Sequence, residues 1–149
     1  MARAFPASTL QRIEEAIAAS ELHHRGEVRF AVEGGLDFFP VLRGLTARQR
    51  ALDAFSQLKV WDTEENSGVL LYVQLADRDI EIVADRGIAG VIPQAQWDAI
   101  CARMEHAFAA REFEAGVLSG IAQIGELLSA HFPAGARNAD ELPNQPVRL

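Results

Sequence analysis

The sequence is poor in the features that mark secreted and membrane proteins. Cys101 is the only cysteine, so no intrachain disulfide can form, as expected in a reducing compartment. No apolar stretch approaches the roughly 20 residues that a membrane-spanning helix needs. The N-terminal residues also lack the apolar core of a signal peptide. These absences predict a cytoplasmic protein that does not insert into a membrane.

Positive charge is scarce as well. Lys59 is the only lysine, and the 149-residue chain carries a formal net charge of −7. Proteins that follow a phosphate backbone or an anionic membrane surface concentrate basic side chains. The charge therefore argues against nucleic-acid binding and against a polybasic membrane-surface protein. No glycine pattern matches a phosphate-binding loop, so no nucleotide or redox cofactor is expected.

The most informative stretch is 66–92, which predicts a β-hairpin. An apolar run, VLLYVQL at 69–75, has the length and composition of a strand, and the polar turn ADRD leads to a second strand, IEIVAD. The first strand is apolar on both faces, so it needs cover on both sides. The whole chain reads as helix, strand, helix, strand, strand, helix, helix. This order predicts an α/β fold, a three-layer α/β/α sandwich with a mixed, Rossmann-like central sheet.

The segments around the hairpin predict its neighbours. The strand at 27–33 alternates polar and apolar residues, which predicts burial of one face only. Thr46 and Gln49 predict a capping box for the helix that follows. Residues 1–132 are expected to form one domain. Residues 133–149 are mostly polar, contain three prolines and lack periodicity, so we expect a flexible C-terminal tail.

Oxygen-bearing side chains flank the hairpin on both sides. Asp62, Glu65 and Asn66 precede its first strand, and Asp85 follows its second. Because antiparallel pairing brings the start of one strand beside the end of the next, the two loops should meet at one end of the sheet. Several oxygen donors at one place suit calcium or magnesium, so these four residues are the candidate metal ligands. A solvated acidic loop without a cation is the alternative, and the sequence leaves it open.

Asp85 and Arg86 are also the candidate catalytic residues. Asp85 supplies a carboxylate, Arg86 a cationic side chain that can donate hydrogen bonds to an anion, and Gly87 a turn. Together these groups could bind a phosphate beside a metal ion. Alternatively, Arg86 pairs with a nearby acid and Gly87 supplies a positive φ that ends the strand. Ser119 lies outside a G-x-S-x-G elbow, and the histidines form no metal motif. Whether the protein is an enzyme stays open.

Taken together, several motifs resemble those of the TPM domain family, and in particular those of its soluble branch, whose members lack a signal sequence. The motifs are NSGVLL at 66–71, the turn DRD at 77–79, IVADRG at 82–87, FAAREFEAGVLSG at 108–120 and GEVRF at 26–30. The first resembles the family's entry into the central strand, and the third its glycine-bearing turn. The fourth is similar to the segment that opens the family's last helix.

The resemblance implies both a fold and a range of functions. Members of the family are α/β/α domains; some lie beside membrane segments, and some have been assigned acid phosphatase activity or a bound calcium. It therefore implies an accessory or binding module that acts with an envelope or membrane protein. The alternative that it implies is a metal-assisted acid phosphatase acting on phosphomonoesters.

Overall fold

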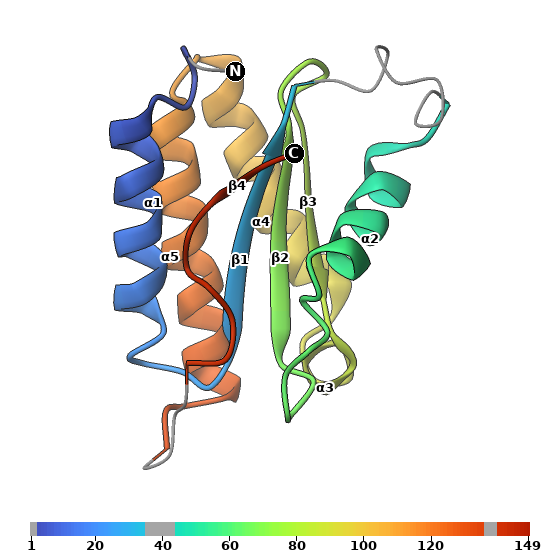
Figure 1. The fold of residues 1–149 in the computed structure, drawn as a ribbon, viewed down its shortest axis with the longest axis vertical. Coiled ribbons are helices and arrows are strands. Elements are labelled where there is room, and N and C mark those ends of the chain that lie inside the picture. The colour runs from blue at the N-terminus through green and yellow to red at the C-terminus, as the bar shows by residue number, and fades with distance from the viewer. Residues whose placement is uncertain (1–2, 35–43, 136–139) are drawn as a thin grey trace.

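A mixed four-stranded sheet lies at the centre of the molecule, between two outer layers (Figure 1). The computed structural model describes residues 3–34, 44–135 and 140–149. The α/β/α sandwich expected from the sequence is confirmed. In chain order its elements are α1 (Ala7–Ser20), β1 (Glu27–Glu33), α2 (Ala47–Gln57), β2 (Gly68–Gln74), β3 (Asp79–Ala84), α3 (Arg86–Ala89), α4 (Gln94–Ala109), α5 (Phe113–His131) and β4 (Val147–Arg148).

The strands lie in the order β3-β2-β1-β4. β2 pairs antiparallel with β3, with Val69 opposite Ala84, so the predicted hairpin is confirmed. β1 runs parallel to β2 along its whole length. β4 runs parallel to β1 but pairs only through Val147 and Arg148. β1 and β2 are therefore the inner strands, as two-sided burial of the VLLYVQL run requires.

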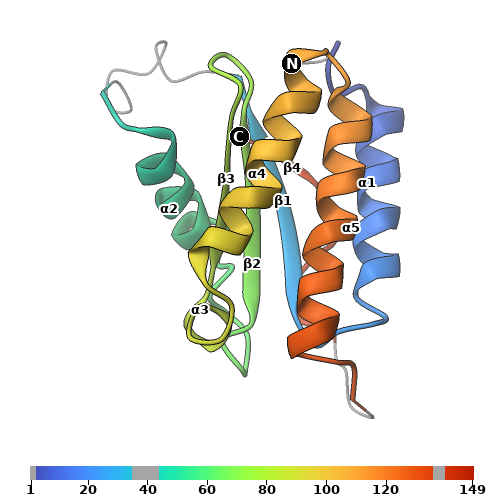
Figure 2. The same ribbon diagram turned by 180° about the vertical axis from the view of Figure 1, so that it is seen from behind.

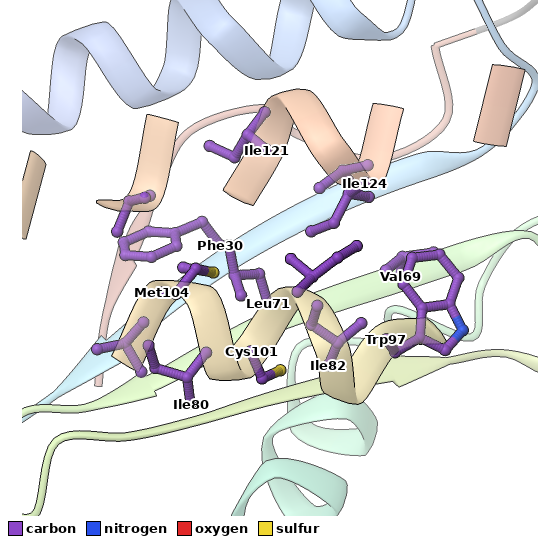
Figure 3. Close-up of a cluster of buried hydrophobic side chains, with 14 of the residues drawn as sticks. Phe30, Val69, Leu71, Ile80, Ile82, Trp97, Cys101, Met104, Ile121 and Ile124 are labelled. Carbon is purple, nitrogen blue, oxygen red and sulfur yellow. The ribbon is translucent and has the colours of Figure 1, made fainter. Parts of the chain in front are cut away.

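The main hydrophobic core lies between the sheet and the layer formed by α1, α4 and α5 (Figure 2). Figure 3 shows the part of this core where Leu71 and Ile82 of the sheet lie against Trp97 and Cys101 of α4. Burial raises the pKa of the Cys101 thiol to about 12, so Cys101 is an inert core residue. None of the helices in the described residues is both long and apolar enough to cross a bilayer.

β1 departs from its predicted pattern, because both of its faces are buried. The alternation of polar and apolar residues predicted one buried face. The polar face carries Glu27, Arg29 and Glu33, and it is covered by α2 and by residues 140–149. Arg50 of α2 neutralises Glu33 with two hydrogen bonds of 2.9 Å each. A charged residue can thus be buried when a distant element supplies its partner, which local alternation does not reveal.

The C-terminal segment corrects a second expectation. We expected residues 133–149 to be a flexible tail, and this is wrong for residues 140–149. Leu142 is 6% exposed and belongs to a smaller apolar cluster beneath α2. The N–H of Leu149 donates to the carbonyl of Val32 at 2.9 Å. A two-residue strand that directly follows Pro146 has too little periodicity to be recognised in the sequence.

The capping box predicted for α2 is confirmed. Thr46 Oγ1 accepts a hydrogen bond from the N–H of Gln49 at 3.1 Å, and Gln49 Oε1 accepts one from the N–H of Thr46 at 2.9 Å. The box fixes the first turn of α2, from which Arg48 reaches β3 and Arg50 reaches β1. The start of this helix thereby anchors it to two strands of the sheet.

Candidate functional site

The loops before β2 and after β3 meet at one end of the sheet, as the hairpin register requires. The N–H of Gly87 donates to the carbonyl of Asn66, and the N–H of Asp85 donates to that of Gly68, both at 2.9 Å. A Cβ atom at Gly87 would lie 2.2 Å from the carbonyl oxygen of Glu65. The φ angle of Gly87 is not positive, so the alternative in which a positive φ at Gly87 ends the strand is wrong. This glycine is therefore required by close contact between the loops.

The side chains of the predicted ligands have separate surroundings. Asp85 Oδ1 accepts a hydrogen bond from the N–H of Arg86 at 2.7 Å and so caps α3, while Asp85 Oδ2 is buried without a hydrogen-bond partner. Glu65 forms an ion pair of 3.1 Å with Arg25. Within the described ranges, Asp62, Glu65 and Asp85 do not form a group whose oxygens all lie within 4.8 Å. A cation held by these residues and Asn66 stays a prediction.

The two candidate catalytic residues differ in exposure, since Asp85 is half-buried and Arg86 is exposed. Across the part of the chain that the structure describes, Arg86 forms no ion pair. Its backbone N–H, and not its guanidinium, makes the contact with Asp85. A catalytic role for Asp85 and Arg86 also stays a prediction.

A different set of carboxylates gathers at the same end of the sheet. Glu21 follows α1, Glu27 opens β1, and Asp140 begins the described part of the C-terminal segment. One carboxylate oxygen from each lies within 4.8 Å of the other two. The N–H of Glu27 donates to the carbonyl of Ser67 at 3.0 Å, which places this cluster beside the loop that enters β2.

Backbone N–H groups hold two of these carboxylates in place. Glu21 Oε2 accepts a hydrogen bond from Val28 at 2.8 Å, and Glu27 Oε1 accepts one from Glu141 at 2.6 Å. Val28 lies in β1, so the sheet fixes the first of these donors. The carboxylates are therefore oriented before any ligand arrives, which lowers the cost of binding.

Two further oxygens of this site receive no hydrogen bond from an N–H or hydroxyl group of the described residues. Glu27 is 3% exposed, and its Oε2 atom is one of them, with the carboxyl of Glu21 as its hydrogen-bonding neighbour. Asn144 Oδ1 is the other. A buried acceptor without such a donor is costly and calls for an explanation. Both residues line, with Glu21 and Asp140, a pocket of about 170 Å³. Such a pocket has room for an ion and part of its hydration shell.

The electrostatics of the cluster favour a positive charge. Burial raises the pKa of Glu21 well above its usual value, and the nearby carboxylates of Glu27 and Asp140 add to the rise against the opposing Val28 hydrogen bond. Burial likewise raises the pKa of Glu27. The cluster therefore holds a proton more tightly than isolated carboxyls do. A cation that enters must displace this proton, so its affinity should increase with pH.

A serine and a histidine also meet near this turn. Ser20 Oγ and His24 Nε2 lie 2.9 Å apart, and the N–H of Gly26 donates to His24 Nδ1 at 3.1 Å. Because Nδ1 accepts, the neutral ring carries its proton on Nε2, which donates to Ser20. A serine nucleophile needs an imidazole that accepts its proton. The pair therefore fixes the turn between α1 and β1 and does not form a hydrolase dyad.

His24 should make the protein sensitive to acid. Burial lowers the pKa of His24 from 6.5 to about 4, so the unfolded chain binds the proton first as the pH falls. Its contribution to stability is present above pH 6.5 and is lost toward pH 4. Between these values the free energy of unfolding should fall by about 2 kcal/mol more in the wild type than in His24→Gln. Urea unfolding at a series of pH values measures this difference, and parallel profiles for the two proteins would contradict it.

Comparison with known proteins decides the family. The model of the TPM domain family matches residues 1–127 of this chain. The chain belongs to the TPM domain family. Glu21 and Glu27 lie within the matched part of this TPM domain, whereas Asp140 lies beyond it.

Solved structures of other proteins share this fold. The NMR structure of the BA42 protein from the psychrophilic bacterium Bizionia argentinensis has 30% sequence identity and a TM-score of 0.83, and the match covers 95% of this chain and 93% of that one. The N-terminal domain of a P. gingivalis protein has 17% identity and a TM-score of 0.69, over 85% of this chain and 77% of that one, and shows likeness of fold alone. No curated protein matches the chain.

Reasoning from the sequence missed the carboxylate cluster of this TPM domain. Glu27 is the first residue of an alternating strand, and Glu21 ends a helical pattern, so each has an ordinary local explanation. Asp140 joins them only because β4 returns to β1. The proximity of Glu21 and Glu27 across a tight turn was the one signal available in the sequence.

Proposed function

We propose that this TPM domain is an accessory module that binds a divalent cation, calcium or magnesium, through Glu21, Glu27 and Asp140. The observation that carries the proposal is that one oxygen from each of these three carboxylates lies within 4.8 Å of the other two, with Glu27 only 3% exposed. A cation at this point would neutralise three neighbouring carboxylates.

The ligand set favours a hard cation. Calcium takes oxygen ligands at about 2.3–2.6 Å, so two ligands on opposite sides of one ion lie about 4.6–5.2 Å apart. One oxygen from each carboxylate lies within 4.8 Å of the other two, so the three are close enough together to bind one such ion. No histidine or cysteine of the described residues belongs to the group, which disfavours zinc and copper. Asn144 Oδ1 and water offer further oxygen ligands.

The partner that we propose is an envelope or membrane protein. This part of the proposal is supported by analogy with other members of the TPM domain family, and analogy of fold is a weaker ground than the chemistry of a site. The position of the cluster adds a physical reason to expect regulation by a cation, since the ion would join the turn after α1 to the C-terminal segment.

Calorimetry tests the cation site. Calcium and magnesium titrated into the wild type should give a saturable heat, and free cation at about 100 times Kd should raise the free energy of unfolding by about 2.7 kcal/mol. Glu27→Gln should abolish both effects, because the amide keeps the acceptor for Glu141 but removes a charged ligand. Asp85→Asn is the matched control, and it should bind as the wild type does.

Each of the other outcomes has a definite meaning. If wild-type protein shows neither heat nor a shift of its thermal midpoint, the proposal fails. If Asp85→Asn loses binding while Glu27→Gln keeps it, the cation belongs with Asp62, Glu65, Asn66 and Asp85.

Phosphatase activity is the second candidate, and the buried Oδ2 of Asp85 without a hydrogen-bond partner is the observation in its favour. It requires cation-dependent turnover of a phosphomonoester that is lost in both Asp85→Asn and Arg86→Ala. The exposed guanidinium of Arg86 and the use of Asp85 Oδ1 as a helix cap speak against it. Our proposal is therefore binding of a cation without turnover.

A further inference from the structure

The outer edge of β1 is covered only in part by another strand. β4 pairs with it through Val147 and Arg148, and the N–H of Leu149 adds one hydrogen bond. Near the start of β1, the N–H of Val28 is taken by the carboxylate of Glu21. The C-terminal segment thus protects the edge with very few main-chain hydrogen bonds.

The opposite edge of the sheet is blocked by side chains. On β3, the carbonyl of Ile82 accepts a hydrogen bond of 2.7 Å from Arg48 Nη1. The N–H of Ile80 donates to the carboxylate of Glu105. Helices α2 and α4 supply these groups, and the core depends on both helices. Among the described strands, β1 therefore offers the edge that a further strand can join, by replacing the C-terminal segment.

The attachment of the C-terminal segment includes the carboxylate cluster. Leu142 anchors it in the smaller apolar cluster, and Glu141 both donates to Glu27 Oε1 and accepts from the N–H of Glu64. Asp140 adds a negative charge beside Glu27. Without a cation, the hydrogen bond from Glu141 to Glu27 and the burial of Leu142 hold this end of the segment. A cation bound by Glu21, Glu27 and Asp140 would add a further attachment.

We propose that residues 140–149 are a displaceable strand, which a cation fastens to the sheet and whose release frees the β1 edge for an extended segment of a partner protein. The proposal rests on the cation site proposed above. The chain's own segment shows what the edge accepts, because it is extended, acidic at its start and apolar at Leu142 and Val147. The partner segment has the same pattern and adds its strand through main-chain hydrogen bonds.

Amide exchange of the full chain tests the fastening. The reporter is the N–H of Leu149, which donates to Val32, and the reference is the N–H of Leu71 in the core. With a chelator present, Leu149 should exchange much faster than Leu71. Free calcium at about 100 times Kd should slow Leu149 exchange about 100-fold. In Asp140→Asn calcium should have little effect on Leu149, whereas Asp62→Asn should behave as the wild type.

A labelled peptide of residues 140–149 tests the freed edge. Full-length Leu142→Ala retains the whole segment but lacks its apolar anchor, so the peptide should bind it at least about tenfold more tightly than it binds the wild type in chelator. Calcium should weaken peptide binding to the wild type. A peptide with Leu142→Asp should not bind either protein.

The outcomes separate this inference from the cation site. Absence of calcium binding in calorimetry would overturn both. Calcium binding that leaves Leu149 exchange unchanged would overturn the displaceable strand and leave the cation site standing. Slower exchange, combined with a peptide that fails to bind Leu142→Ala or binds regardless of calcium, would overturn the claim that the edge accepts a partner.

Discussion

Arg50→Met is expected to lower the free energy of unfolding by about 3–5 kcal/mol, the usual cost of breaking a buried ion pair on one side. Arg50 Nε and Nη2 each donate to an oxygen of Glu33 at 2.9 Å, and Tyr72 adds a hydrogen bond to the same carboxylate at 2.7 Å. Glu33 is only 3% exposed. Without Arg50 the protein must bury this charge uncompensated or protonate it.

A double-mutant cycle measured by urea unfolding at neutral pH checks this prediction. Glu33→Gln removes the charge that Arg50 neutralises, so the double variant Glu33→Gln/Arg50→Met should lose much less stability than the sum of the two single changes. Costs that simply add, or an Arg50→Met protein that unfolds at the wild-type midpoint, would show that the pair is not buried as described.

Leu71→Ala is expected to cost about 2–5 kcal/mol, through lost burial and the cavity left behind. Leu71 is fully buried at the middle of β2, where it packs in the main core (Figure 3). Leu22→Ala is the matched control, since Leu22 is 74% exposed, and its cost should stay within about 0.5 kcal/mol. Equal denaturation midpoints for the two variants would contradict the placement of Leu71.

The central hairpin was predictable because its signal is local. The apolar run at 69–75 indicates a strand that is buried on both faces, and the turn after it is short and polar. The meeting of the loops before β2 and after β3 followed from pairing alone. The α/β/α arrangement then needed only the order of elements.

What could not be predicted depends on contacts between distant residues. Burial of Glu33 requires Arg50 from another helix, and no local rule supplies that partner. The cluster of Glu21, Glu27 and Asp140 requires a C-terminal segment that is fastened by two residues of strand. The sequence predicted a site at this end of the sheet from other acids, Asp62, Glu65 and Asp85, because those acids stand next to the strands in the chain.

Chemical-shift mapping of the isotope-labelled TPM domain tests the central claim most directly. The amide of Val28 donates to Glu21 and that of Glu141 donates to Glu27, while the amide of Arg86 donates to Asp85. Titration with calcium should move the Val28 and Glu141 resonances most and leave Arg86 nearly unchanged. Saturable shifts at Arg86 with Val28 and Glu141 unmoved, or no saturable shift at all, would contradict the account.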